Sequence, residues 1–184
     1  MHFARPVLLA LLGVAAAQAA APTKAVIQRG AYLVGVGGCN DCHTPLKMGP
    51  KGPEPDMTRM LSGHPEALKM PPAPKLPEGP WMVTMAGSAT AFAGPWGVSY
   101  AANLTSDKQT GLGGWTEAQF LQMVRTGRHL GQGRPILPPM PVPSLKAMTE
   151  SDLKAVFAYL QTVPAVANRV PAATEPAPSS IPMH

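Results

Sequence analysis

The chain has 184 residues, with 15 basic and 10 acidic side chains and a formal net charge of +5. This excess is small and dispersed, which excludes the concentrated basic patch expected of a nucleic-acid-binding domain. The length predicts one compact domain with a sizeable core.

Residues 1–19 have the pattern of a secretory signal peptide. Arg5 stands in a short basic region, an apolar run follows from Val7 to Ala17, and Ala17-Gln18-Ala19 has small residues where cleavage is expected. The apolar run is shorter than the roughly twenty residues that a spanning helix needs, so a retained membrane anchor is the weaker alternative. With no cysteine near this point, a lipoprotein anchor is excluded. We therefore expect a periplasmic protein without a stable transmembrane anchor.

The first predicted helix runs from Lys24 to Val36, because Val26, Leu33 and Val34 recur at helical spacing. Gly30 lies inside it and costs about 1 kcal/mol relative to alanine. We expect Gly30 to mark a close crossing with another helix.

The only two cysteines follow, in the sequence Cys39-Asn40-Asp41-Cys42-His43. This C-x-x-C-H pattern indicates one covalently attached haem c, with thioethers from Cys39 and Cys42 and with His43 as a ligand of the iron. Export is consistent with this reading, because two cysteines three apart would otherwise be left as a strained, reactive disulfide in an oxidising compartment.

Three alternatives to haem attachment are a redox dithiol, half a zinc site and a chance match. A redox dithiol is expected after a strand, whereas the residues before Cys39 are helical and rich in glycine. A structural zinc site usually has a second Cys or His pair at matching spacing, which the sequence does not supply.

Residues 44–80 form a proline-rich insertion in which long helices and central strands are not expected. Short helical turns are allowed at residues 56–61 and 65–68. So long a loop is often functional, and we expect it to cover the haem or to form the surface that meets a partner. His64 lies here and could approach the iron, but a surface or loop-capping histidine is the simpler interpretation.

Short apolar runs between residues 81 and 102 allow brief strand-like pairs involving Val83, Met85, Val98 and Tyr100. Helical periodicity then returns from Trp115 to Arg125, with Gly127 as the expected C-cap.

The last predicted helix starts at Thr149, where Thr149 and Asp152 form an S/T-x-x-D/E signal, and Pro164 bounds it. The predicted organisation is a signal peptide at 1–19, a haem domain at 20–163 and a tail at 164–184. The tail is rich in proline and alanine, and we expect it to be mobile or to lie over the surface.

The second axial ligand of the iron decides between electron transfer and ligand chemistry. Met140 is the expected ligand, because flanking prolines restrict its backbone and its loop returns the chain towards the haem just before the last helix. The alternatives are that Met140 only fills the core, or that His129 takes the position. His129 reads more simply as an exposed turn.

These blocks together resemble the class I monohaem cytochromes c, and in particular the haem domains of cytochrome c subunits of bacterial membrane-bound alcohol and gluconate dehydrogenases. The resemblance extends over about residues 24–171. The segments that carry it are 29–34, 39–45, 94–105, 110–116, 133–135, 139–141 and 152–160.

The resemblance implies an all-α cytochrome c fold with long loops rich in proline and glycine, in which the first and last helices cross at Gly30 and Tyr159. It also implies that Trp115 hydrogen-bonds a haem propionate, although an ordinary core aromatic is an equal alternative. Such subunits usually carry three C-x-x-C-H motifs and a C-terminal membrane helix. One motif without such a helix favours a soluble single-haem carrier.

The function expected from this is a non-enzymatic periplasmic one-electron carrier with a His43–Met140 iron. Its partners would be a dehydrogenase as donor and an oxidase or another cytochrome as acceptor. Two alternatives stay open: an accessory haem subunit docked on a dehydrogenase, and a haem enzyme or sensor with an open sixth site.

Overall fold

A computed structural model describes residues 21–77 and 79–174. The predicted signal peptide, and the tail beyond residue 174, lie outside the described residues. The described helices are α1 (Lys24–Val36), α2 (Cys39–His43), α3 (Glu117–Thr126), α4 (Val142–Lys146) and α5 (Glu150–Leu160), with short 3-10 turns at Met57–Arg59 and His129–Gly131. The strands are β1 (Leu46–Gly49), β2 (Gly52–Pro55), β3 (Thr84–Met85), β4 (Ala91–Gly94) and β5 (Gly97–Tyr100).

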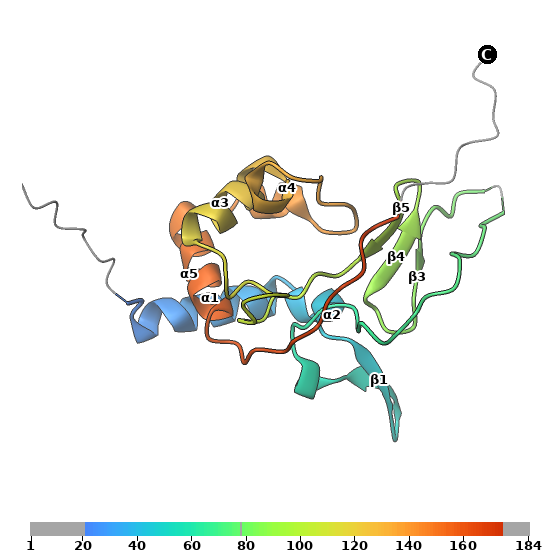
Figure 1. The fold of residues 1–184 in the computed structure, drawn as a ribbon, viewed down its shortest axis with the longest axis horizontal. Coiled ribbons are helices and arrows are strands. Elements are labelled where there is room, and N and C mark those ends of the chain that lie inside the picture. Colours follow the sequence, from blue (N-terminus) through green and yellow to red (C-terminus); the bar gives the residue numbers. More distant parts are fainter. Residues whose placement is uncertain (1–20, 78, 175–184) are drawn as a thin grey trace, which may run out of the picture.

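Helices α1 and α5 pack against each other (Figure 1). Gly30 allows the approach, since a Cβ atom at this position would overlap the backbone of Ala155 and the Cβ of Tyr159. The guanidinium of Arg29 adds a two-pronged ion pair with Asp152, at 2.9 and 3.3 Å, across the same contact. The crossing expected at Gly30 is therefore present.

The core lies where α1, α3 and α5 meet. Phe120 of α3 and Phe157 of α5 stack with ring centres 5.3 Å apart, and Leu61 reaches the same cluster from the insertion. The buried members are Val34, Leu61, Leu112, Phe120, Val124, Leu153, Phe157, Leu160 and Val163. Burial of this apolar set is what holds the three helices together.

Caps fix the ends of α3 and α5. Thr116 and Gln119 form a complete capping box at the start of α3, and Gly127 ends it in the left-handed conformation at φ 72°. The side chain of Thr149 accepts from the backbone N–H of Asp152 at 3.1 Å, as its sequence signal predicts. The N-terminal boundaries of both helices therefore follow from local sequence.

The prediction of an all-α fold is wrong, because the chain also forms two antiparallel sheets. Strands β1 and β2 make a hairpin, and β3, β4 and β5 make a three-stranded sheet in that order (Figure 1). The three-stranded sheet lies within residues 81–102, where brief strand-like pairs were expected. The fold is therefore a mixture of helices and small sheets.

Prolines did not prevent the hairpin in the insertion. Pro53 pairs with Met48 and Pro55 with Leu46, so the two prolines occupy alternate positions of β2. Hydrogen-bonded and non-bonded pairs alternate in an antiparallel ladder, and two residues without an N–H can share the non-bonded positions. A two-stranded ribbon thus accepts prolines that a central strand would not.

Residues 164–174 lie against the domain. The side chain of Asn168 is 2% exposed and donates to the carbonyls of Ser62 and His64 at 2.7 and 2.9 Å. Thr174 pairs with Val98 of β5. None of the helices within the described ranges is long and apolar enough to cross a membrane.

Candidate haem-binding site

The C-x-x-C-H motif forms its own short helix, α2. Gly38 begins it in the left-handed conformation at φ 65°, and the N–H of Thr44 ends it by donating to the carbonyl of Asn40. Residues three apart on a helix share a face, so Cys39 and Cys42 point the same way, and both are free thiols. The motif follows α1 through two glycines and not a strand, which does not match a redox dithiol.

The buried hydroxyl of Thr44 connects α2 to the insertion by hydrogen bonds. Thr44 is fully buried; its hydroxyl donates to the Asn40 side chain at 2.8 Å and accepts from the N–H of Leu61 at 2.8 Å. The carbonyl of His43 accepts from the N–H of Gly63 at 2.7 Å. A Cβ at Gly63 would overlap backbone atoms of Ala101 and Ala102, so only glycine brings these segments so close.

The His43 ring is held in a form that can bind a metal. The ring is buried, and its Nδ1 lies 2.7 Å from the carbonyl oxygen of Ala102. A carbonyl oxygen can only accept, so Nδ1 carries the proton and donates it, which leaves the lone pair on Nε2. Burial lowers the pKa of His43 and outweighs this hydrogen bond, which raises it. His43 is therefore a neutral, oriented imidazole of the kind that ligates iron.

The two thiols lie in a partly buried environment. Burial is the main cause that raises the pKa of both Cys39 and Cys42, and the nearby carboxylate of Asp41 raises it further. Both sulfurs are therefore uncharged at neutral pH. Two protonated thiols on one face beside an oriented imidazole fit the group that the motif indicates, a haem attached by two thioethers.

Met140 lies in a tight turn before α4. It is partly buried, its N–H donates to the carbonyl of Leu137 at 3.3 Å, and its own carbonyl accepts from Val142 at 2.8 Å. The turn is attached to β5, because the hydroxyl of Ser99 lies 2.6 Å from the carbonyl oxygen of Pro138. In Figure 1 the loop that leads into α4 lies between α4 and β5.

The other predicted side chains occupy distinct places. Trp115 packs partly buried against the helical core, with its ring edge-on to His129 at 5.1 Å between centres. His129 is exposed in its 3-10 turn, as the sequence suggested. Burial and the nearby charge of Arg134 lower its pKa.

His64 is not a surface histidine, which was one of the roles considered for it. It is fully buried, with Nδ1 2.9 Å from the Thr90 hydroxyl and Nε2 2.9 Å from the carbonyl oxygen of Leu68. Its ring also packs against Tyr100, at 4.8 Å between centres. Both nitrogens are occupied within the insertion and its neighbours, so the loop-capping role is confirmed.

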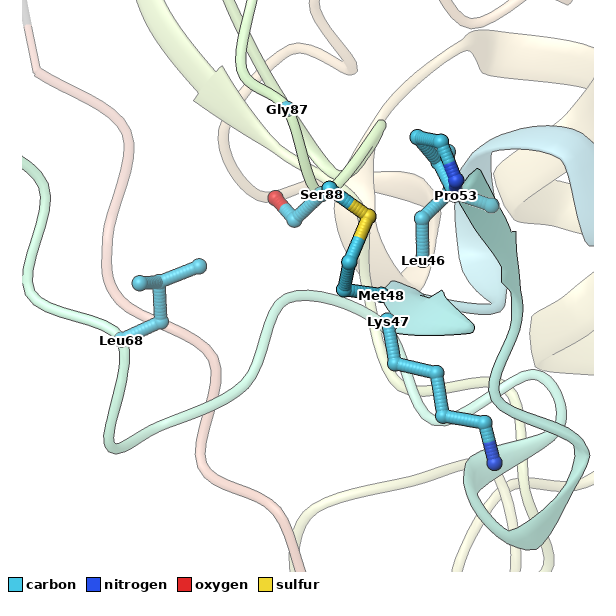
Figure 2. A pocket seen from close by; sticks show the side chains of 7 residues that line it. All are labelled: Leu46, Lys47, Met48, Pro53, Leu68, Gly87 and Ser88. Atoms are coloured by element: carbon cyan, nitrogen blue, oxygen red, sulfur yellow. The ribbon is translucent and has the colours of Figure 1, made fainter. Parts of the chain in front are cut away.

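A separate surface pocket lies beside the hairpin of the insertion. Figure 2 shows its lining side chains, with Met48 and Ser88 close together and Leu68 opposite. The lining residues are Leu46, Lys47, Met48, Pro53, Leu68, Gly87 and Ser88. The motif residues and Met140 do not line this pocket.

Sequence reasoning missed the residues that support the site. The carbonyl of Ala102, the N–H of Gly63 and the hydroxyl of Ser99 act on segments 59, 20 and 39 residues away in the chain. A backbone carbonyl has no side-chain signature. Of the three supports, Gly63 alone has a local signal in the sequence, because a glycine can mark a close approach of the backbone.

Comparisons with known proteins agree with the motif. No family model matches the chain. It is 29% identical over 149 residues to the cytochrome c subunit of a quinone alcohol dehydrogenase from Gluconacetobacter polyoxogenes, a match that covers 81% of this chain and 24% of the relative. It is 29% identical over 135 residues to the gluconate 2-dehydrogenase cytochrome c subunit of Pantoea cypripedii, covering 73% and 22%.

A third relative, the fructose dehydrogenase cytochrome subunit of Gluconobacter japonicus, is 33% identical over 72 residues, covering 39% of this chain and 15% of the relative. The chain spans about a quarter of the length of the first two relatives. The resemblance to cytochrome c subunits of dehydrogenases is thus confirmed.

Proposed function

We propose that this chain is an exported electron-transfer protein that carries one electron at a time on a single haem c. Cys39 and Cys42 would hold the haem by thioethers, and His43 and Met140 would ligate its iron. The observation that carries the proposal is the buried His43 ring, fixed by the Ala102 carbonyl with Nε2 free to bind. The similarity to named cytochrome c subunits supports it.

The bound haem supplies a one-electron ferrous–ferric couple, and the protein supplies ligation, burial and orientation. The Ala102 carbonyl keeps the His43 imidazole in one tautomer and one orientation. Met140 would add a neutral, soft sulfur donor, which favours the ferrous state and raises the potential. An iron that is fully coordinated by two protein ligands would change its coordination geometry little on electron transfer, so the reorganisation energy would be small.

Trp115 is the proposed donor to a haem propionate. Its support is its position directly before the Thr116 cap of α3, partly buried and edge-on to exposed His129. An indole N–H can only donate, and a carboxylate only accepts, so the pair is chemically matched. Replacing Trp115 with Phe keeps the packing and removes the donor.

A second candidate is an accessory haem subunit that works within a dehydrogenase complex. The names of the relatives favour it, since they are described as subunits of alcohol, gluconate and fructose dehydrogenases. In that case the electron donor is the dehydrogenase, and an oxidase or another cytochrome accepts the electron. Co-purification with a larger dehydrogenase from the periplasm separates this candidate from a free carrier.

Covalent attachment is tested by expressing the full chain with haem-maturation machinery and staining a denaturing gel for haem. We expect the wild type to keep one haem per chain under denaturation. Cys39→Ser and Cys42→Ser should each keep at most one thioether, and the double variant none. Haem lost from the denatured wild type would contradict the proposal.

A further inference from the structure

The segment that begins with β5 touches the surroundings of both proposed iron ligands. The Ser99 hydroxyl lies 2.6 Å from the carbonyl oxygen of Pro138, two residues before Met140. The Ala102 carbonyl oxygen lies 2.7 Å from Nδ1 of His43. Three residues of extended chain span about 10 Å, so one short segment connects the two ligand-bearing parts of the fold.

The direction of the Ser99 bond follows from its partners. The Pro138 carbonyl can only accept, so the hydroxyl donates. The Ser99 hydroxyl oxygen accepts from the indole N–H of Trp96 at 3.3 Å, and the carbonyl oxygen of Phe92 lies farther from this hydroxyl than that of Pro138, at 3.5 Å. Ser99 is 8% exposed, which limits competition from water. The Ser99 hydroxyl therefore donates its proton to the carbonyl oxygen of Pro138.

The turn around Met140 is held together by hydrogen bonds of its own. Its backbone is closed by the bond from Met140 to the Leu137 carbonyl and by the bond from Val142 to the Met140 carbonyl. Within the described residues, the hydrogen bond that joins residues 137–141 to the sheet is the one from Ser99. If that bond is lost, the turn keeps its shape but loses its attachment to the segment that orients His43.

We propose that Ser99 is a positioning residue for Met140. Its hydroxyl anchors the Pro138 carbonyl and so holds the methionine sulfur where the iron is bound. The proposal rests on the proposed function, because it takes Met140 as the iron ligand. Without the hydroxyl, the sulfur leaves the iron more often, and the fraction of chains with an open sixth position rises.

The test measures how fast carbon monoxide binds the ferrous holoprotein, because it can bind only while Met140 is away. Ser99→Ala should bind it about fivefold to tenfold faster than the wild type, the change expected for loss of one buried hydrogen bond. Ser106→Ala is the matched control. Its hydroxyl donates to the Val163 carbonyl at the same 2.6 Å, but outside the Met140 turn.

Two further readouts separate positioning from general destabilisation. The sulfur-to-iron charge-transfer absorption of the ferric protein should disappear at a lower pH in Ser99→Ala than in Ser106→Ala. Ser99→Thr, which restores the hydroxyl, should return both the rate and the absorption towards wild type. Equal carbon monoxide rates in the two alanine variants would overturn the proposal.

Met140→Ala distinguishes this failure from that of the proposed function. If Met140→Ala binds carbon monoxide rapidly while Ser99→Ala behaves like wild type, only the role of Ser99 is overturned. If Met140→Ala itself binds no faster than wild type, the ligand assignment is overturned, and the role of Ser99 with it.

Discussion

Gly30→Ala tests how closely α1 and α5 pack. The added Cβ would overlap the carbonyl oxygen and carbon of Ala155 and the Cβ of Tyr159. Backbone atoms cannot rotate away, so the overpacking cost lies near the upper end of its usual range, about 3 kcal/mol. The better helix propensity of alanine returns about 1 kcal/mol. The net loss of unfolding free energy is then about 2 kcal/mol.

The assay is thermal unfolding of the holoprotein followed by circular dichroism. For a chain of this size, 2 kcal/mol corresponds to a fall in Tm of about 4–8 °C. Gly35→Ala is the matched control in the same helix, since no neighbouring atom lies within 4 Å of its new Cβ. It should keep or raise the Tm. If Gly30→Ala matches Gly35→Ala, the close helix contact does not exist.

Two further predictions concern buried polar groups. Burial lowers the pKa of His64, so the unfolded chain binds more protons below the ordinary value of 6.5, and stability falls as the pH drops through that value. In urea unfolding, His64→Gln should lose stability less steeply than wild type over this range; parallel curves would contradict this. Asn168→Ala leaves the carbonyls of Ser62 and His64 and the side chain of Arg59 without their partner, and should cost roughly 3 kcal/mol or more. A loss below about 1 kcal/mol in the same assay would show that water replaces these bonds.

Three of the helices, α1, α3 and α5, and their caps were predictable because their signals are local. The periodicity of the first helix gave its bounds, and Thr149 and Gly127 marked the ends of two others as the structure has them. The cap signals act over one turn of helix or less, and the periodicity acts within a single helix. No long-range contact is needed to read either.

The β1–β2 hairpin was not predicted, because the prolines of the insertion argue against central strands and do not show which strand they would pair with. In β2, Pro53 and Pro55 alternate with Gly52 and Glu54, so the prolines can take the non-hydrogen-bonded pairs while Gly52 and Glu54 supply the N–H groups of the hydrogen-bonded pairs. The pairing partner decides whether a proline is tolerated, and the partner is not visible in a single run of sequence. The same limitation hid the burial of His64, whose partner Thr90 is 26 residues away.

The candidate site also has a part that local sequence predicts and a part that depends on long-range contacts. The proposed roles of Cys39, Cys42 and His43 follow from their spacing alone, within five residues. The orientation of His43 depends on Ala102, and the attachment of the Met140 turn depends on Ser99. Both supports come from one strand and its extension, so they became visible only when that strand was placed.

The most direct test of the account is a redox titration of the purified, exported holoprotein followed by absorption spectra, with Met140→Ala alongside. We expect one haem per chain, low-spin in both oxidation states in the wild type. In Met140→Ala we expect a lowered potential and an iron that binds carbon monoxide readily. A variant that stays low-spin in both states with an unmoved potential would contradict the assignment of Met140 to the iron.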